Sequence, residues 1–193
     1  MKLVLASSSK YRQQLLKKLG LPFQCHSPNI DETPKPEESA RVLSTRLARE
    51  KAFAIARLYP EHLIIASDQS AQLGNTLLGK PGNKERAIKQ LTRCSGNKVT
   101  FYTALVLLNS KSQQCHTECI PFHVHFKTLT QEQISGYVEK DNPVDCAGSF
   151  KCEGLGIALF EKLEGDDPNT LIGLPLITLN TMLAKEGIDP LLL

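Results

Sequence analysis

Charged and hydroxyl side chains that suit a bound polyphosphate gather in the first half of the sequence, at predicted turns, strand ends and helix edges. Carboxylates can hold a divalent metal ion, while guanidinium, ammonium and hydroxyl groups bind phosphate oxygens. If the fold brings these side chains together, they predict a site for a metal-bound polyphosphate. The group comprises Ser7, Ser9, Arg12, Glu32, Lys51, Asp68 and Lys80.

A second cluster of cysteines and histidines raises the alternative of a structural zinc site. The spacing disfavours it, because there is no Cys-x-x-Cys, and His123 and His125 would share one face of a strand without a second ligand pair nearby. We also interpret the six cysteines as free thiols, since a chain of this length does not need a disulfide framework. The cluster comprises Cys115, His116, Cys119, His123 and His125.

The serines lie between a predicted strand over residues 3–5 and a predicted helix over 11–19. Ser9 is a natural N-cap for this helix, whose first backbone N–H groups would point into the turn and could hold an anion. The simpler interpretation, a cap and nothing more, remains open from the residues alone.

Lys51 falls on the apolar stripe of a predicted helix over residues 39–59, together with Leu43, Leu47, Ile55 and Leu58. Such a lysine either extends along the edge of the core to reach water or points its ammonium group into a cleft. The helical spacing leaves both alternatives open.

Asp68 follows a buried-strand pattern over residues 62–67, so we expect it at the carboxyl end of that strand. Ligands bind at the carboxyl ends of strands in open α/β sheets, which favours Asp68 as a functional residue. Lys80 lies in a Gly- and Pro-containing segment over 77–83, a pattern that equally describes an ordinary surface turn.

The second half predicts a hairpin followed by a capped helix. A strand over 98–108 returns through a strand with one wetter face, and Thr130 to Gln133 fits a capping box. Residues 147–163 suggest a bulged strand pair beside a ligand, and a last helix is predicted over 176–185. Strands and helices that alternate around a long hairpin predict a mixed α/β fold with a mixed sheet.

The composition is typical of one globular domain, which we place at residues 1–193, because 41% of the residues are hydrophobic and 22% are charged. The net charge of +3 is too small and too evenly spread to predict a nucleic acid polymer or a membrane surface as a partner. No apolar run reaches the roughly 18 residues of a membrane span. We found no secretory signal either, and therefore expect a cytoplasmic protein.

Six ordered motifs, which cover nearly the whole chain, resemble those of the Maf family of nucleoside triphosphate pyrophosphatases. They read LVLASSSKYR, LAREKA, IIASDQ, LLGKPGN, AGSFKCEGLG and IGLPL. The resemblance implies an elongated mixed sheet with flanking helices and two lobes around a deep nucleotide-binding cleft, as in inosine triphosphatase-like proteins. It also implies hydrolysis between the α and β phosphates, which yields a nucleoside monophosphate and pyrophosphate.

The same resemblance suggests roles for individual residues. Asp68 matches the general base and, with Glu32, the metal site, which would hold a divalent cation such as Mg²⁺, Mn²⁺ or Co²⁺. The residues that match phosphate contacts are Ser7, Ser9, Arg12, Lys51 and Lys80. The chain departs from the family pattern at Lys10 and at three further positions, which are Tyr11, Gln69 and Glu153.

These last three departures resemble the branch of the family that acts on 7-methyl-GTP. A carboxylate can only accept, so Glu153 would fit the adjacent N1–H and N2 donors of guanine. N7-methylation makes the base cationic, which would strengthen stacking on Tyr11. Two alternatives remain, namely a non-catalytic nucleotide-binding regulator of cell division and a pyrophosphatase with a different or broader base preference. Whether the chain forms a homodimer is left open.

Overall fold

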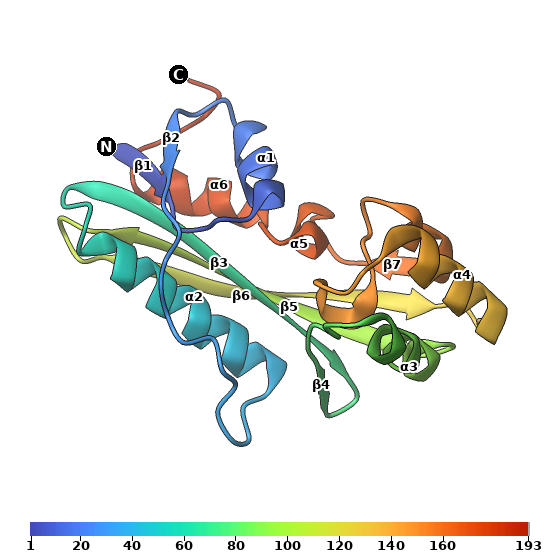
Figure 1. Ribbon diagram of the computed structural model, residues 1–193. Coiled ribbons are helices and arrows are strands. Elements are labelled where there is room, and N and C mark those ends of the chain that lie inside the picture. The colour runs from blue at the N-terminus through green and yellow to red at the C-terminus, as the bar shows by residue number, and fades with distance from the viewer. Residues whose placement is uncertain (193) are drawn as a thin grey trace. The chain divides into compact units, whose positions relative to one another are not determined.

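The computed structural model describes residues 1–192; residue 193, the last of the predicted domain, lies outside the described residues. Parallel and antiparallel strands share one seven-stranded sheet in the order β2-β1-β3-β5-β6-β7, and β4 pairs with β3 (Figure 1). This confirms the predicted mixed α/β class. The strands are β1 (Lys2–Leu5), β2 (Phe23–Cys25), β3 (His62–Leu73), β4 (Thr76–Leu78), β5 (Lys98–Asn109), β6 (Cys115–Phe126) and β7 (Phe160–Glu164).

Six α-helices and two 3₁₀ turns accompany the sheet in the described residues. They are α1 (Lys10–Lys17), α2 (Ala40–Ala56), α3 (Lys84–Cys94), α4 (Gln131–Asp141), α5 (Asn169–Ile172), α6 (Leu176–Lys185), η1 (Ala147–Ser149) and η2 (Leu155–Leu159). The capping box at Thr130 and Gln133 is present as predicted. None of the helices in residues 1–192 is long and apolar enough to cross a membrane.

The chain divides into two compact units, each built from separate segments. The first unit contains Met1–Gln69, Thr103–Ile120 and the chain from Asp167 onward, and the second contains Ser70–Tyr102 and Pro121–Asp166. The first unit carries helices on both faces of its strands, with α1 and α6 on one face and α2 on the other (Figure 1).

Alternation along β1 explains the two apolar layers of the first unit. Leu3 and Leu5 point to the layer that contains α1 and α6, whereas Val4 packs with Ala52 of α2 in the other layer. Successive side chains of a strand point to opposite faces, so a four-residue strand can supply both layers. The buried face of α2 is therefore directed onto the sheet.

Aromatic rings form much of the core of the second unit. Phe150 packs edge to face against Phe101, Phe126 and Phe160, with ring centroids 4.7 to 5.7 Å apart. Such T-shaped pairs are the favoured geometry for aromatic rings. Phe150 lies directly before the segment that carries Glu153, so the rings anchor one end of that segment.

The structure corrects three sequence expectations. Asp68 does not end its strand, because β3 continues to Leu73 and turns at Gly74, with φ of 55°, to pair with β4. Residues 147–163 form η1, η2 and a single strand rather than a bulged strand pair, since positive φ at Gly148 and Ser149 interrupts any strand. Leu58 lies beyond the end of α2 and is exposed.

Candidate active site

The turn between β1 and α1 presents hydroxyl groups and backbone donors, as the serine run suggested. Ser7 Oγ accepts from the backbone N–H of Ser9 at 3.1 Å, and Ser9 Oγ accepts from the N–H of Arg12 at 3.4 Å. Ser9 is the N-cap of α1. A helix of eight residues therefore begins here with its positive end toward the turn.

Lys51 joins two carboxylates that are distant in sequence. Its Nζ lies 2.6 Å from Asp68 Oδ1 and 2.6 Å from Glu32 Oε1, and its side chain is only 8% exposed. Lys51 therefore ion-pairs within the buried stripe of its helix instead of reaching along the core edge to water. The helix α2, the strand β3 and the loop before α2 each contribute one of these three groups.

The electrostatics of this cluster are set by burial. Burial raises the pKa of the Asp68 carboxyl, and the positive charge and hydrogen bond of Lys51 oppose the shift. Burial lowers the pKa of the Arg12 guanidinium, an effect partly offset by Asp68 and Glu32. The cluster thus holds two cations and two carboxylates, with a carboxyl whose proton affinity is increased by its surroundings.

A separate ion pair holds the loop that carries Glu32. The Arg46 guanidinium binds Glu38 at 2.6 Å and donates to the Thr33 carbonyl at 3.1 Å. The hydrogen bond from Arg46 lowers the pKa of Glu38 to about 2. The loop that carries Glu32 is therefore attached to α2, which is the helix that also carries Lys51.

Gly173 is a contact point that sequence reasoning missed. Its carbonyl accepts from Arg12 Nε and from Ser67 Oγ, each at 2.9 Å. Its φ of 117° is in the region that favours glycine, and a Cβ there would lie 3.3 Å from Arg12 Nε. The only signal for it was the IGLPL motif, which names the segment but not its partner.

Gln69 is occupied by contacts within the first unit. Its Nε2 donates to Thr103 Oγ1 at 2.8 Å and lies 2.9 Å from the carbonyl oxygen of Thr170 and 3.1 Å from that of Leu171. Thr103 Oγ1 also donates to the Thr170 carbonyl at 2.9 Å. Gln69 and Thr103 therefore hold the chain just before Gly173, a role that sequence reasoning did not predict.

Tyr11 belongs to the first unit, whereas Lys80 and Glu153 belong to the second. Tyr11 is 43% exposed at the start of α1, and Lys80 is exposed between β4 and α3. Glu153 is exposed and accepts from Cys152 Sγ at 3.3 Å. Burial and the nearby Glu153 raise the pKa of the Cys152 thiol to about 12, so the thiol keeps the proton that it donates.

Helix α4 fixes the segment that carries Glu153. The Tyr137 hydroxyl accepts from the backbone N–H of Lys151 at 3.0 Å, and Lys151 Nζ donates to the Asp141 carbonyl at 2.6 Å. Burial and a hydrogen bond with Asp141 raise the pKa of Tyr137. A Cβ at Gly154 would lie 3.3 Å from the Asp141 carboxylate, so glycine permits this close approach. We name the contacts of Tyr137, Asp141, Lys151 and Gly154 the α4 latch.

The donor set of the first unit fits a divalent metal ion only in part. Glu32 and Asp68 each place a carboxylate oxygen on the same ammonium group, so both could reach one cation. Residues 1–192 contain no group of three or more His, Cys, Asp or Glu side chains arranged to hold a metal. Mg²⁺ commonly uses one or two carboxylates and completes its shell with water and substrate phosphates, so the two carboxylates fit that mode.

The mixed sheet with its flanking helices defines an α/β protein, and its first unit brings two cations and two carboxylates together. The chain belongs to the Maf-like protein family, whose sequence description matches residues 2–186. It is also similar to the Ham1 protein of Staphylococcus aureus at 14% identity over 66% of this chain and 73% of that one, with a TM-score of 0.47.

Proposed function

We propose that this protein is a nucleoside triphosphate pyrophosphatase that hydrolyses 7-methyl-GTP to 7-methyl-GMP and pyrophosphate. The observation that carries the proposal is Lys51, buried between the carboxylates of Asp68 and Glu32. The buried Lys51–Asp68 ion pair contributes little to stability relative to apolar packing, which favours a functional reason for it. Membership of the Maf-like family agrees with a nucleotide substrate.

Asp68 is proposed to take the proton of the attacking water. Its pKa is raised by burial, which brings its basicity closer to the range of an effective general base. Arg12 and Lys51, with Ser7, Ser9 and Lys80, are proposed to bind the phosphate oxygens. Because Glu32 and Asp68 occupy Lys51 in the present structure, the incoming phosphates would have to compete for that ammonium group.

Glu32 and Asp68 would hold a divalent cation, Mg²⁺, Mn²⁺ or Co²⁺, which would neutralise charge on the phosphates. The side chains around the cation would still bind the phosphate oxygens and take the proton of the attacking water. Arg12, hydrogen-bonded to Gly173, would present its remaining donors in one fixed direction.

The base preference is proposed to depend on Glu153 and Tyr11. Glu153 would accept from N1–H and N2 of guanine, and its exposure agrees with a ligand contact. The exposed ring of Tyr11 offers a stacking face for the cationic methylated base. The contacts of Gln69 within the first unit support a positioning role for that residue in place of a direct contact through its nitrogen.

The test measures kcat/KM for 7-methyl-GTP, GTP and UTP with Mg²⁺, Mn²⁺ or Co²⁺, in the parent protein and in variants. We expect Glu153→Gln to lower kcat/KM for 7-methyl-GTP about tenfold to a hundredfold, because one acceptor becomes a donor that faces a donor. Tyr11→Ala should lower kcat/KM for 7-methyl-GTP by removing the stacking face. In both variants, kcat/KM for UTP should fall much less.

Glu161→Gln is the matched control, because Glu161 is an exposed carboxylate on β7 of the same unit. Equal losses for all three substrates in Glu153→Gln and Tyr11→Ala would withdraw the base assignment while leaving the pyrophosphatase assignment in place. Nucleotide binding without pyrophosphate release from any substrate would favour the non-catalytic regulator.

A further inference from the structure

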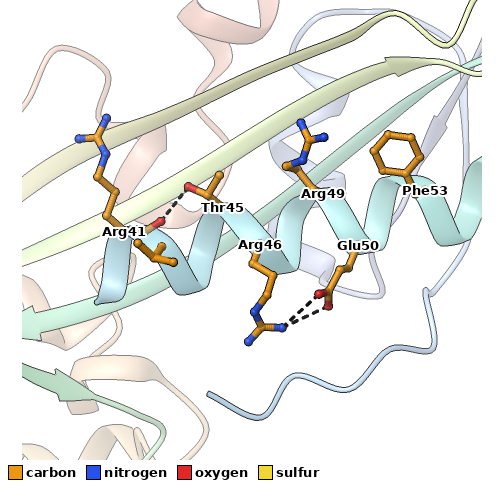
Figure 2. Close-up of a pocket in the computed structure, with 7 residues that line it drawn as sticks. Arg41, Thr45, Arg46, Arg49, Glu50 and Phe53 are labelled. Atoms are coloured by element: carbon orange, nitrogen blue, oxygen red, sulfur yellow. Dashed lines mark hydrogen bonds and ion pairs between the residues drawn. The ribbon is translucent and has the colours of Figure 1, made fainter. Parts of the chain in front are cut away.

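The outer face of α2 carries a groove of about 640 Å³ that is separate from the buried Lys51 cluster. Arg41, Thr45, Arg49 and Phe53 recur at every fourth residue along one side of this groove. Figure 2 shows these four side chains on one side of α2 and Arg46 with Glu50 on the other. We name Arg41, Thr45, Arg49 and Phe53 the basic stripe.

The positive charge of the basic stripe is not neutralised by the protein. Arg46, beside the stripe, pairs with Glu38 at 2.6 Å and with Glu50 at 3.2 Å. Within residues 1–192, neither Arg41 nor Arg49 has a carboxylate partner. Arg49 is nevertheless held in place, because it donates to Thr117 Oγ1 at 3.2 Å and lies 5.6 Å from the ring centroid of Phe53.

One edge of β6 lies beside the basic stripe, and β7 covers only part of this edge. On its β7 side, β6 pairs from His123 to Phe126, so Cys115 to Ile120 has no strand neighbour on that side within the described residues. Arg49 contacts Thr117, and Ser44 lies 3.6 Å from Cys119 Sγ. The open edge therefore follows α2 in the antiparallel direction. An uncovered edge offers a row of backbone N–H and C=O groups for pairing.

The spacing of the two arginines matches an extended chain. Arg41 and Arg49 are eight helical residues apart, which is a rise of about 12 Å. Side chains four residues apart on a strand lie on one face and are separated by about 13 Å. We propose that an extended acidic peptide segment of a partner protein adds to the Cys115 to Ile120 edge as a further strand, with acidic side chains at positions i and i+4 on Arg49 and Arg41.

A second copy of this chain is a poorer occupant. Two β6 edges that paired about a two-fold axis near Thr117 would place the basic stripe of one copy against that of the other. Like charges brought together in this way repel. A segment that supplies carboxylates on one face of a strand satisfies both the open edge and the stripe.

The probe is a fluorescein-labelled, amide-capped peptide of sequence Thr-Glu-Val-Thr-Val-Glu-Thr, whose two glutamates share one face. Binding to the full chain is measured by fluorescence anisotropy. Arg41→Gln and Arg49→Gln should each weaken binding about tenfold, since each removes a charge-assisted contact. Arg93→Gln, which removes an exposed arginine on α3 and leaves α2 unchanged, should bind as the parent does. A peptide with glutamine at both glutamate positions should also bind at least tenfold more weakly.

Backbone pairing is tested with two N-methylated peptides, because alternate residues of a strand point their N–H groups to opposite edges. Methylation of the odd or of the even amides should abolish binding in one case only. The bound peptide should protect from hydrogen exchange those amides of residues 115–120 that face the open edge. Equal binding by both methylated peptides would overturn the proposal. The proposal would also be overturned if inorganic triphosphate displaced the labelled peptide and if Arg49→Gln weakened triphosphate binding as much as peptide binding. It would be overturned as well if the unliganded chain formed a dimer that Arg41→Gln dissociated.

Discussion

A single substitution separates the chemistry of Asp68 from its structural contacts. In Asp68→Asn, the amide oxygen can still accept from Lys51 Nζ, now 2.6 Å from Asp68, whereas the amide cannot take a proton from water. We expect at least about a hundredfold loss in kcat, with nucleotide affinity changed far less. The measurement is steady-state hydrolysis together with a nucleotide titration at equilibrium.

Asp166→Asn serves as the control, because Asp166 is an exposed carboxylate without a hydrogen bond or ion pair within the described residues. Its activity should equal that of the parent. If Asp68→Asn hydrolysed the substrate at the parental rate, Asp68 would be excluded as the base and the proposed mechanism would need another proton acceptor.

At the residue scale, the sequence pointed to Lys51 but left its environment open. Helical periodicity placed it on the apolar stripe of α2, which the structure confirms. Its two carboxylate partners come from a loop and a strand, and no spacing within one element can reveal such a contact. The same limit applies to Gly173, whose partners Arg12 and Ser67 are separated from it by 161 and 106 residues.

At the scale of elements, the α4 latch determines how firmly the segment around Glu153 is held. Tyr137→Phe removes the hydroxyl that accepts from the Lys151 N–H at 3.0 Å and leaves that donor without its partner. We expect the ratio of kcat/KM for 7-methyl-GTP over UTP to fall several-fold, while kcat/KM for UTP stays close to the parental value. The assay is the same substrate panel.

A double-variant comparison shows whether Tyr137 acts through Glu153. In the Glu153→Gln background, Tyr137→Phe should produce little further change in the substrate ratio, because the carboxylate that it positions is absent. Tyr102→Phe, a partly buried tyrosine on β5 of the same unit, provides the comparison for loss of a hydroxyl. An additive fall in the double variant would mean that Tyr137 affects selectivity by another route.

Element prediction succeeded where one local signal dominated. The predicted caps Ser9 and Thr130 each begin a helix in the structure. It failed over residues 147–163, where glycines suggested bulges but the chain forms 3₁₀ turns held by the distant Tyr137. The prediction also ended β3 too early. The sequence becomes polar after Ala66, whereas the pairing of Ala71 with Leu78 extends the strand.

At the scale of the whole molecule, neither disulfides nor a resident metal is expected to hold the fold together. All six cysteines are free thiols, and the apolar layers of the first unit are extensive. We therefore expect a strong reductant or EDTA to leave the Tm essentially unchanged. EDTA should still abolish hydrolysis, because the two carboxylates would share the metal with the substrate.

These two readouts are measured by thermal unfolding and by pyrophosphate release, with Mg²⁺ restored as the control. A marked fall in Tm with EDTA would contradict the prediction and would reopen the question of a structural metal. Hydrolysis at the full rate in EDTA would instead mean that the reaction needs no metal ion. The proposed role of Asp68 as the base would be unaffected.

The chain passes between the two units four times, and this has a consequence for protein synthesis. The first unit needs the chain from Asp167 onward, which supplies Leu179 and Leu183 to its apolar layer and the Gly173 carbonyl to Arg12. The ribosome makes this segment after the other segments of the first unit. A nascent or prematurely terminated chain therefore carries Ser7, Lys51 and Asp68 without the segment that completes their surroundings, so ribosome-bound chains should acquire hydrolytic activity only after residues beyond about 183 have left the exit tunnel.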